Sequence, residues 1–168
     1  VLSGIGHLPV EVARSAKSLG YQVVAVGVVP GIDEELEPSV DYYYDINIGK
    51  IGKIISTLKK HKVTRVTMIG KVTKEVLYKA GAIVPDLRAI KILASVPDRK
   101  DDTIMNAIVK ELESEGIEVM DQTILIKPLL PAPGVLTKRK PTEAELADME
   151  FGFEMAKAIG GLDIGQTV

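Results

Sequence analysis

The sequence contains no cysteine in its 168 residues. A disulfide framework and a thiolate-held metal are therefore excluded, and a reducing compartment is expected. The two histidines, His7 and His61, stand far apart and disfavour a zinc site. No run reaches the roughly 18 to 20 continuous apolar residues of a membrane span, and no charged-then-apolar secretory signal opens the chain. These absences predict a cytoplasmic chain.

A nucleophile motif and a conventional chain start are also missing. The sequence has no Gly-x-Ser-x-Gly elbow, so a nucleophilic hydrolase is not supported. It does not begin with Met, and only Val1 to Ser3 precede the first glycine. Because two or three residues are too few for a buried strand, we expect the first strand to begin upstream of Val1.

Basic residues are scarce at both ends of the chain. Residues 1–49 hold two Lys or Arg against seven Asp or Glu, residues 50–110 hold 14 against five, and residues 111–168 hold five against 11. The formal net charge of −2 gives no general attraction to nucleic acid, and no nucleic-acid partner is expected. The basic middle block has two interpretations, which stay open: solvated lysine-rich helix faces, or attraction to a polyanionic ligand.

The glycine turn Gly4-Ile5-Gly6-His7-Leu8-Pro9 is the first candidate site. Gly4 permits a tight reversal, Gly6 lets a ligand approach the backbone, and Pro9 suits the first turn of a helix. The free N–H groups that follow predict an anion site. His7 either donates a hydrogen bond or acts as an acid or base beside a phosphate, or it only decorates the turn.

Hydrophobic periodicity predicts alternating strands and helices. We expect helices over 9–19, 48–58, 86–96 and 101–115, and strands over 22–29, 63–69 and 117–120, with a further short strand around Tyr42-Tyr43-Tyr44. This order is typical of an α/β fold, which we predict to be Rossmann-like. Its open, mainly parallel sheet has about five strands and helices on both faces.

The cluster Pro131-Ala132-Pro133-Gly134 marks a domain boundary. It divides the chain into a Rossmann-like N-terminal domain, residues 1–131, and a second part, residues 132–168. Thr142 and Glu145 fit a capping box that starts a helix. That linker helix leads to residues 163–168, which we expect to open a strand of a C-terminal domain that the chain does not complete.

Two later motifs add candidate site residues. Gly70-Lys71 falls at the carboxyl end of a predicted strand, where ligands bind in open parallel sheets. Asp101 and Asp102 start a predicted helix, where they either stabilise the helix N-terminus or bridge Mg²⁺ to a phosphate. A dinucleotide enzyme also needs an acid directly after the second strand, but Pro30-Gly31 stands there and Asp33 is the nearest acid. Nucleotide or phosphate binding therefore stays open while NAD is disfavoured.

Eight short motifs then occur along the chain in a fixed order: Gly4-Ile5-Gly6-His7-Leu8-Pro9, Val23-Val24-Ala25-Val26, Gly70-Lys71-Val72, Pro85-Asp86-Leu87, Asp101-Asp102, Gly134-Val135-Leu136, Pro141-Thr142 and Asp163-Ile164-Gly165-Gln166. In this order and spacing they resemble the I-type UDP-2,3-diacylglucosamine pyrophosphatase family over essentially the whole chain. Ile5 departs from the Gly-Asn-Gly that is common there, and Lys71 departs from a common Gly-Gly.

The resemblance implies the N-terminal half of a lipid A synthesis enzyme that hydrolyses UDP-2,3-diacylglucosamine to UMP and a lipid sugar phosphate. It implies a divalent metal, Mg²⁺ or Mn²⁺, whose main ligand belongs to a C-terminal half missing here, so that the chain alone is inactive and carries no catalytic residue. The substrate-binding residues that it implies are Gly4, Ile5, Gly6, His7, Gly70, Lys71, Asp101 and Asp102. No metal ligand is assigned among them.

The partners implied are a UDP-linked lipid sugar or another nucleotide-sugar, and the protein's own C-terminal domain. Homo-oligomer formation and peripheral contact with the inner membrane stay open. Two other functions compete with the hydrolase. A non-catalytic nucleotide or nucleotide-sugar binding protein would use the same turns without Asp101 and Asp102, and an NAD-dependent enzyme is the third hypothesis.

Overall fold

The structure is a computed structural model that describes residues 1–73, 83–98, 100–162, 164, 165 and 167. The chain divides into two compact units, Val1–Leu129 and Leu130–Val168, each of which is described by itself. The first unit carries every strand among the described residues.

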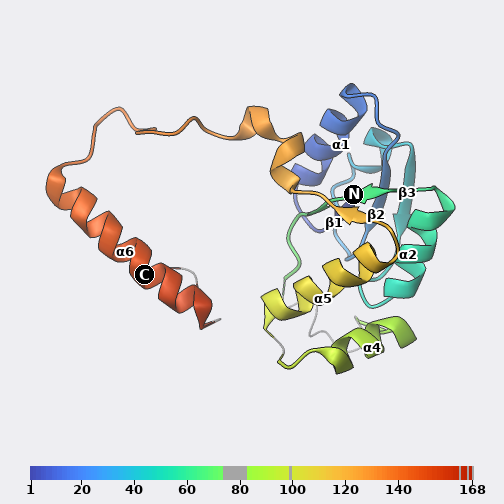
Figure 1. The fold of residues 1–168 in the computed structure, drawn as a ribbon. Coiled ribbons are helices and arrows are strands. Elements are labelled where there is room, and N and C mark those ends of the chain that lie inside the picture. The colour runs from blue at the N-terminus through green and yellow to red at the C-terminus, as the bar shows by residue number, and fades with distance from the viewer. Residues whose placement is uncertain (74–82, 99, 163, 166, 168) are drawn as a thin grey trace. The chain divides into compact units, whose positions relative to one another are not determined.

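Four short strands form the main sheet, and all of their pairings are parallel. They are β1 (Leu2–Ser3), β2 (Val24–Gly27), β3 (Tyr42–Asp45) and β5 (Met68–Ile69), in the spatial order β3-β2-β1-β5 (Figure 1). Ser3 of β1 lies opposite Gly27 on one side and Ile69 on the other. The sheet therefore has β1 near its middle, and the chain turns off it at Gly4.

Helices cover both faces of this sheet. They are α1 (Leu8–Ser18), α2 (Ile51–Lys60), α4 (Leu87–Ser95) and α5 (Asp101–Ser114). Strand β2 is buried along its whole length, and its side chains alternate between two hydrophobic clusters: Val26 packs with α2, α4 and α5, and Ala25 packs with α1. The predicted open α/β fold with a mainly parallel sheet is confirmed.

The predicted strand 63–69 is divided between two sheets. Residues Arg65–Val66 form β4, which pairs with β6 (Glu118–Val119), and only Met68–Ile69 form β5 in the main sheet. The carbonyl of Val66 accepts from the Met120 N–H at 2.7 Å, whereas the next carbonyl, of Thr67, accepts from the Leu2 N–H at 2.9 Å. Because the hydrogen-bonding partner changes at Thr67, the described residues form one four-stranded and one two-stranded sheet instead of about five strands together.

The elements that follow β6 are all helical. Two 3₁₀ turns, Gln122–Leu125 and Lys127–Leu129, end the first unit, and the second unit contains α6 (Glu143–Gly161). The capping box is confirmed: the Glu145 N–H donates to Thr142 Oγ1 at 3.3 Å and the Thr142 N–H donates to Glu145 at 2.8 Å. Residues 163, 166 and 168 of the predicted last strand lie outside the described residues. Across the described helices, none is both long and apolar enough to cross a membrane.

Candidate functional site

The candidate site lies where the strand order of the main sheet reverses. The chain passes outward from β1 through β2 to β3, and then returns to place β5 on the other side of β1. In open α/β sheets, ligands bind outside the carboxyl ends of the strands at such a reversal. Gly4 follows β1 directly and Gly70 follows β5 directly, so the two glycine turns predicted as phosphate-facing meet at this point.

The two turns are hydrogen-bonded to each other. Ile5 and Lys71 form an antiparallel bridge in which each N–H donates to the other's carbonyl at 2.8 Å, and the Gly4 N–H donates to the Ile69 carbonyl at 2.9 Å. The structure thus brings Gly4, Ile5, Gly70 and Lys71 together. Because the Ile5 and Lys71 N–H groups are already used, a ligand would lie over the paired turns instead of between them.

Glycine is required in these turns for two different reasons. A Cβ on Gly4 would lie 2.7 Å from the Lys71 carbonyl oxygen, and one on Gly70, where φ is +99°, would lie 2.7 Å from the Gly4 carbonyl carbon. Gly6 has a φ of +114°, but a Cβ there would meet nothing within 4 Å. Gly4 and Gly70 therefore allow two backbones to touch, whereas Gly6 is needed for its left-handed conformation.

Unused backbone donors follow the first turn. Among the described residues, the N–H groups of Gly6, His7 and Leu8 have no hydrogen-bond partner, and α1 begins at Leu8 with Pro9 in its first turn. Free N–H groups at a helix start, together with the helix dipole, suit an anion. These three donors are the part of the turn that can hold a phosphate.

His7 is held between two carboxylates. Its Nδ1 lies 2.9 Å from Asp33 and its Nε2 lies 3.2 Å from Glu11, on the first turn of α1. The hydrogen bond with Asp33 is the main reason that the pKa of His7 is raised above its usual value. Both ring nitrogens can donate only when the ring is protonated. A charged His7 thus ties the glycine turn to the loop after β2. It engages Asp33, the acid nearest to the position that would bind a ribose hydroxyl in an NAD site.

The charge of His7 makes the stability of the chain depend on pH. Because folding raises the pKa of His7, its contribution to stability is complete below about pH 6.5 and is lost as the pH rises through the raised value. We expect an NMR titration of the His7 ring to give a pKa above that of a free histidine, and Asp33→Asn to return it toward the free value. Equal pKa values in the two proteins would contradict the pairing.

The other predicted residues, Lys71, Asp101 and Asp102, are exposed. Lys71 is exposed at the second turn, and Asp101 and Asp102 are exposed in the first turn of α5, where they favour the helix dipole. Met105, one helical turn after Asp101, lines the same cavity as Gly4 and Gly70.

The described residues do not fit a metal held by this chain. No three His, Asp or Glu side chains among them lie close enough together to hold a metal ion. The acids nearest the glycine turn, Glu11 and Asp33, both pair with His7. The described residues therefore supply no group of three metal ligands.

A second hollow, which the sequence did not single out, lies at the carboxyl ends of β2 and β3. It measures about 490 Å³ and is lined by residues 27–32 and by Tyr43, Asp45 and Asn47. The Tyr43 hydroxyl donates to Asp45 at 2.7 Å, and burial is the main reason that the pKa of Tyr43 is raised. A Cβ on Gly27 would lie 2.6 Å from the Tyr43 hydroxyl. The glycine that ends the buried strand β2 is the sequence signal that could have located the hollow.

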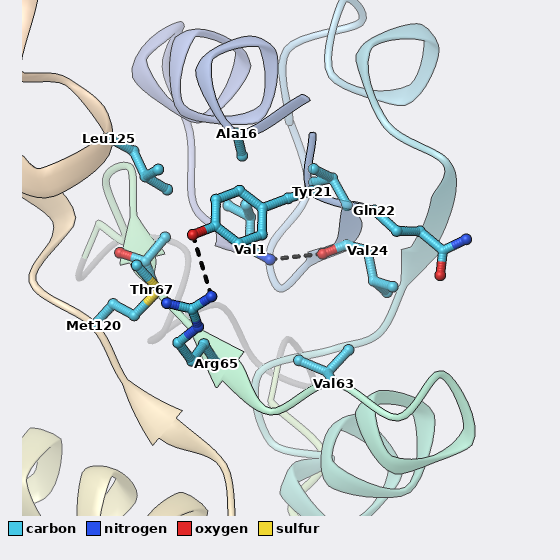
Figure 2. A pocket seen from close by; sticks show the side chains of 11 residues that line it. Val1, Ala16, Tyr21, Gln22, Val24, Val63, Arg65, Thr67, Met120 and Leu125 are labelled. Atoms are coloured by element: carbon cyan, nitrogen blue, oxygen red, sulfur yellow. Dashed lines mark hydrogen bonds between the residues drawn. The ribbon is translucent and has the colours of Figure 1, made fainter. Parts of the chain in front are cut away.

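A third pocket lies at the opposite, amino ends of the strands. Figure 2 shows the Arg65 guanidinium donating to the Tyr21 hydroxyl at 3.2 Å, beside Thr67 and Met120. The buried Thr67 hydroxyl has no hydrogen-bond partner within the described structure. With a volume of about 80 Å³, this pocket is far smaller than the roughly 300 to 1,000 Å³ of ligand sites. It is separate from the glycine turns.

Comparison with known proteins covers both units. A family model of the LpxI N-terminal domain matches residues 1–129, and a family model of the LpxI C-terminal domain matches residues 132–168. A protein of Caulobacter vibrioides, UDP-2,3-diacylglucosamine pyrophosphatase LpxI, is 32% identical over 171 residues. The alignment covers 99% of this chain and 59% of that relative, so the chain spans about three fifths of the relative's length.

Proposed function

Because the chain belongs to the LpxI family, we propose that the protein containing it hydrolyses the pyrophosphate of UDP-2,3-diacylglucosamine to UMP and a lipid sugar phosphate. These matches confirm the family that the ordered motifs predict. The substrate comes from the name of the Caulobacter relative and is carried to this chain as part of the proposal.

One structural observation carries the proposal. The two glycine turns meet where the strand order reverses, and the N–H groups of Gly6, His7 and Leu8 are unused there among the described residues. A pyrophosphate carries its charge on oxygens, which accept hydrogen bonds from such donors. The site is therefore matched to the part of the substrate that the reaction breaks.

These residues would bind and orient the substrate. The three N–H groups need not move when the substrate binds, because α1 and the Ile5–Lys71 bridge already hold them in place. Donors fixed in advance stabilise charge that develops on phosphate oxygens as water attacks phosphorus and the phosphoanhydride bond breaks. Lys71, exposed at the second turn, would add a positive charge beside the same oxygens.

The wider interaction partners follow from the same proposal. A divalent metal, Mg²⁺ or Mn²⁺, would take its main ligands from outside the described residues, which do not gather a metal site. The protein's own C-terminal domain would complete the active site. Peripheral contact with the inner membrane and homo-oligomer formation are compatible with an acylated substrate but are not needed for the phosphate site.

The test is release of UMP from UDP-2,3-diacylglucosamine by the protein that contains this chain, with Mg²⁺ or Mn²⁺ present. We expect UMP and the lipid sugar phosphate in equal amounts. UDP binding without UMP release would instead favour a nucleotide-sugar binding protein. Protection against heating by NAD but not by UDP would favour the dinucleotide enzyme and overturn the proposal.

A further inference from the structure

Two apolar cavities lie next to each other in the Val1–Leu129 unit. The first, about 240 Å³, lies beneath the glycine turns and is lined by Gly4 and Gly70 together with side chains of the sheet, α2 and α5. The second, about 190 Å³, lies among α2, α4 and α5. Three side chains line both cavities: Ile48, Ile51 and Ile108. The two cavities are therefore adjacent, one at the glycine turns and one in the helical layer.

The lining of these cavities excludes a charged or strongly polar occupant. Every described side chain that lines either cavity is aliphatic, a methionine or a proline, and no charged or hydroxyl side chain takes part. Cavities of this kind stay dry and bind apolar molecules, because water would find no hydrogen-bond partners there. The occupant must therefore be hydrocarbon.

The glycine turns beside the first cavity have the opposite character. Gly4 and Gly70 form part of its wall, and the exposed Lys71 and the unused N–H groups of Gly6 and His7 belong to the same two turns. A ligand that occupies both regions has an anionic group at the turns and a hydrocarbon chain below them. Met105, 42% exposed on α5, lines the first cavity with a flexible side chain that can adapt to such a chain.

We propose that the two cavities bind one acyl chain of an amphiphilic ligand whose phosphate lies at the glycine turns. This deepens the proposed function, on which it rests for the acyl identity of the chain, and it places part of the lipid within the Val1–Leu129 unit. The two cavities together fall in the range of roughly 300 to 1,000 Å³ that is usual for ligand sites. Ile108 lies at the boundary between them and limits how far the chain enters.

The test measures binding of a homologous series of single-chain ligands to the chain by calorimetry. Inorganic phosphate, hexyl phosphate, octyl phosphate and decyl phosphate are used below the concentrations at which they form micelles. Because each buried methylene tightens binding about three- to fourfold, we expect the Kd to fall by that factor for each added carbon. Ile108→Trp fills the boundary between the cavities and should reduce the gain to less than about 1.5-fold per carbon.

The matched control is Val109→Trp, on the same helix, because Val109 is also partly exposed and lines neither cavity. It should keep the full dependence on chain length. If Ile108→Trp fails to fold, Met105→Trp blocks the first cavity from an exposed position. A dependence on chain length that is absent in the unmodified chain, or that survives both Ile108→Trp and Met105→Trp, overturns the proposal.

The same series separates this proposal from the proposed function. If inorganic phosphate binds tightly and longer alkyl chains do not tighten binding, the phosphate site is retained and the acyl site is rejected. The opposite result, in which decanol binds as strongly as decyl phosphate and phosphate does not compete, would retain the hydrocarbon site and reject phosphate binding at the turns. UMP release is not measured in either case, so neither result depends on hydrolysis.

Discussion

Gly4→Ala is expected to lower the free energy of unfolding by about 4 kcal/mol. The added Cβ would lie 2.7 Å from the Lys71 carbonyl oxygen and 2.8 Å from both the Gly70 carbonyl carbon and the Lys71 nitrogen. All three atoms are backbone, so no side chain can rotate away. The turns would have to separate, and the Ile5–Lys71 bridge would break.

Two other glycines serve as controls for Gly4→Ala. Gly20 has a φ of +83° and a Cβ there would meet nothing within 4 Å, so Gly20→Ala carries the cost of backbone strain alone, about 1 to 2 kcal/mol. Gly70→Ala carries both this strain and the contact with Gly4. Urea unfolding measures the free energy of unfolding of all three variants. If Gly4→Ala costs no more than Gly20→Ala, the close approach of the two turns is wrong.

Asp86→Ala is expected to cost about 3 kcal/mol, because one carboxylate serves two helices. Asp86 is the N-cap of α4, where it accepts from the Ala89 N–H at 2.9 Å, and its other oxygen accepts from the Gly52 N–H in the first turn of α2 at 2.7 Å. Removing the carboxylate leaves donors of both helices without a partner. Urea unfolding should show a loss larger than the roughly 1 kcal/mol of an ordinary cap.

The stabilisation that Asp86 provides should be lost at low pH. Burial raises its pKa, but hydrogen bonds from the N–H groups of Ala89, Gly52, Lys53 and Arg88 together outweigh burial and lower the pKa below its usual value. Its contribution to stability is therefore complete above about pH 4 and is lost as the pH falls through the lowered value. We expect Asp86→Asn to be less stable than the unmodified chain at pH 7 and the difference to shrink below pH 4. A constant difference would contradict a charged cap.

The local features of the chain were predictable from sequence. Helices α4 and α5 start and end within about two residues of their predicted bounds. Asp86 marks the start of α4 and Gly116 marks the end of α5, and both signals depend only on neighbouring residues. The capping box of α6 depends only on Thr142 and Glu145. The turns at Gly4 and Gly70 are likewise local: the first is indicated by the spacing of Gly4, Gly6 and Pro9, and the second by the strand that Gly70 ends.

The long-range features were not predictable in the same way. Strand 63–69 looks continuous because its residues are uniformly suited to a strand, and only the positions of Leu2 and Met120 reveal that it changes partners at Thr67. The bridge between Ile5 and Lys71 and the second helix held by Asp86 join residues far apart in sequence. A single sequence does not say which of its turns and caps meet.

The placement of phosphate at the paired turns is tested most directly by NMR titration of the ¹⁵N-labelled chain with UDP. We predict that the amide signals of Gly6, His7 and Leu8 shift most, because these N–H groups are the unused donors among the described residues, and that the signal of Gly20, at the far end of α1, stays in place. Largest shifts around Gly27 and Asp45 instead, with Gly6 to Leu8 unchanged, would contradict the glycine turns as the phosphate site.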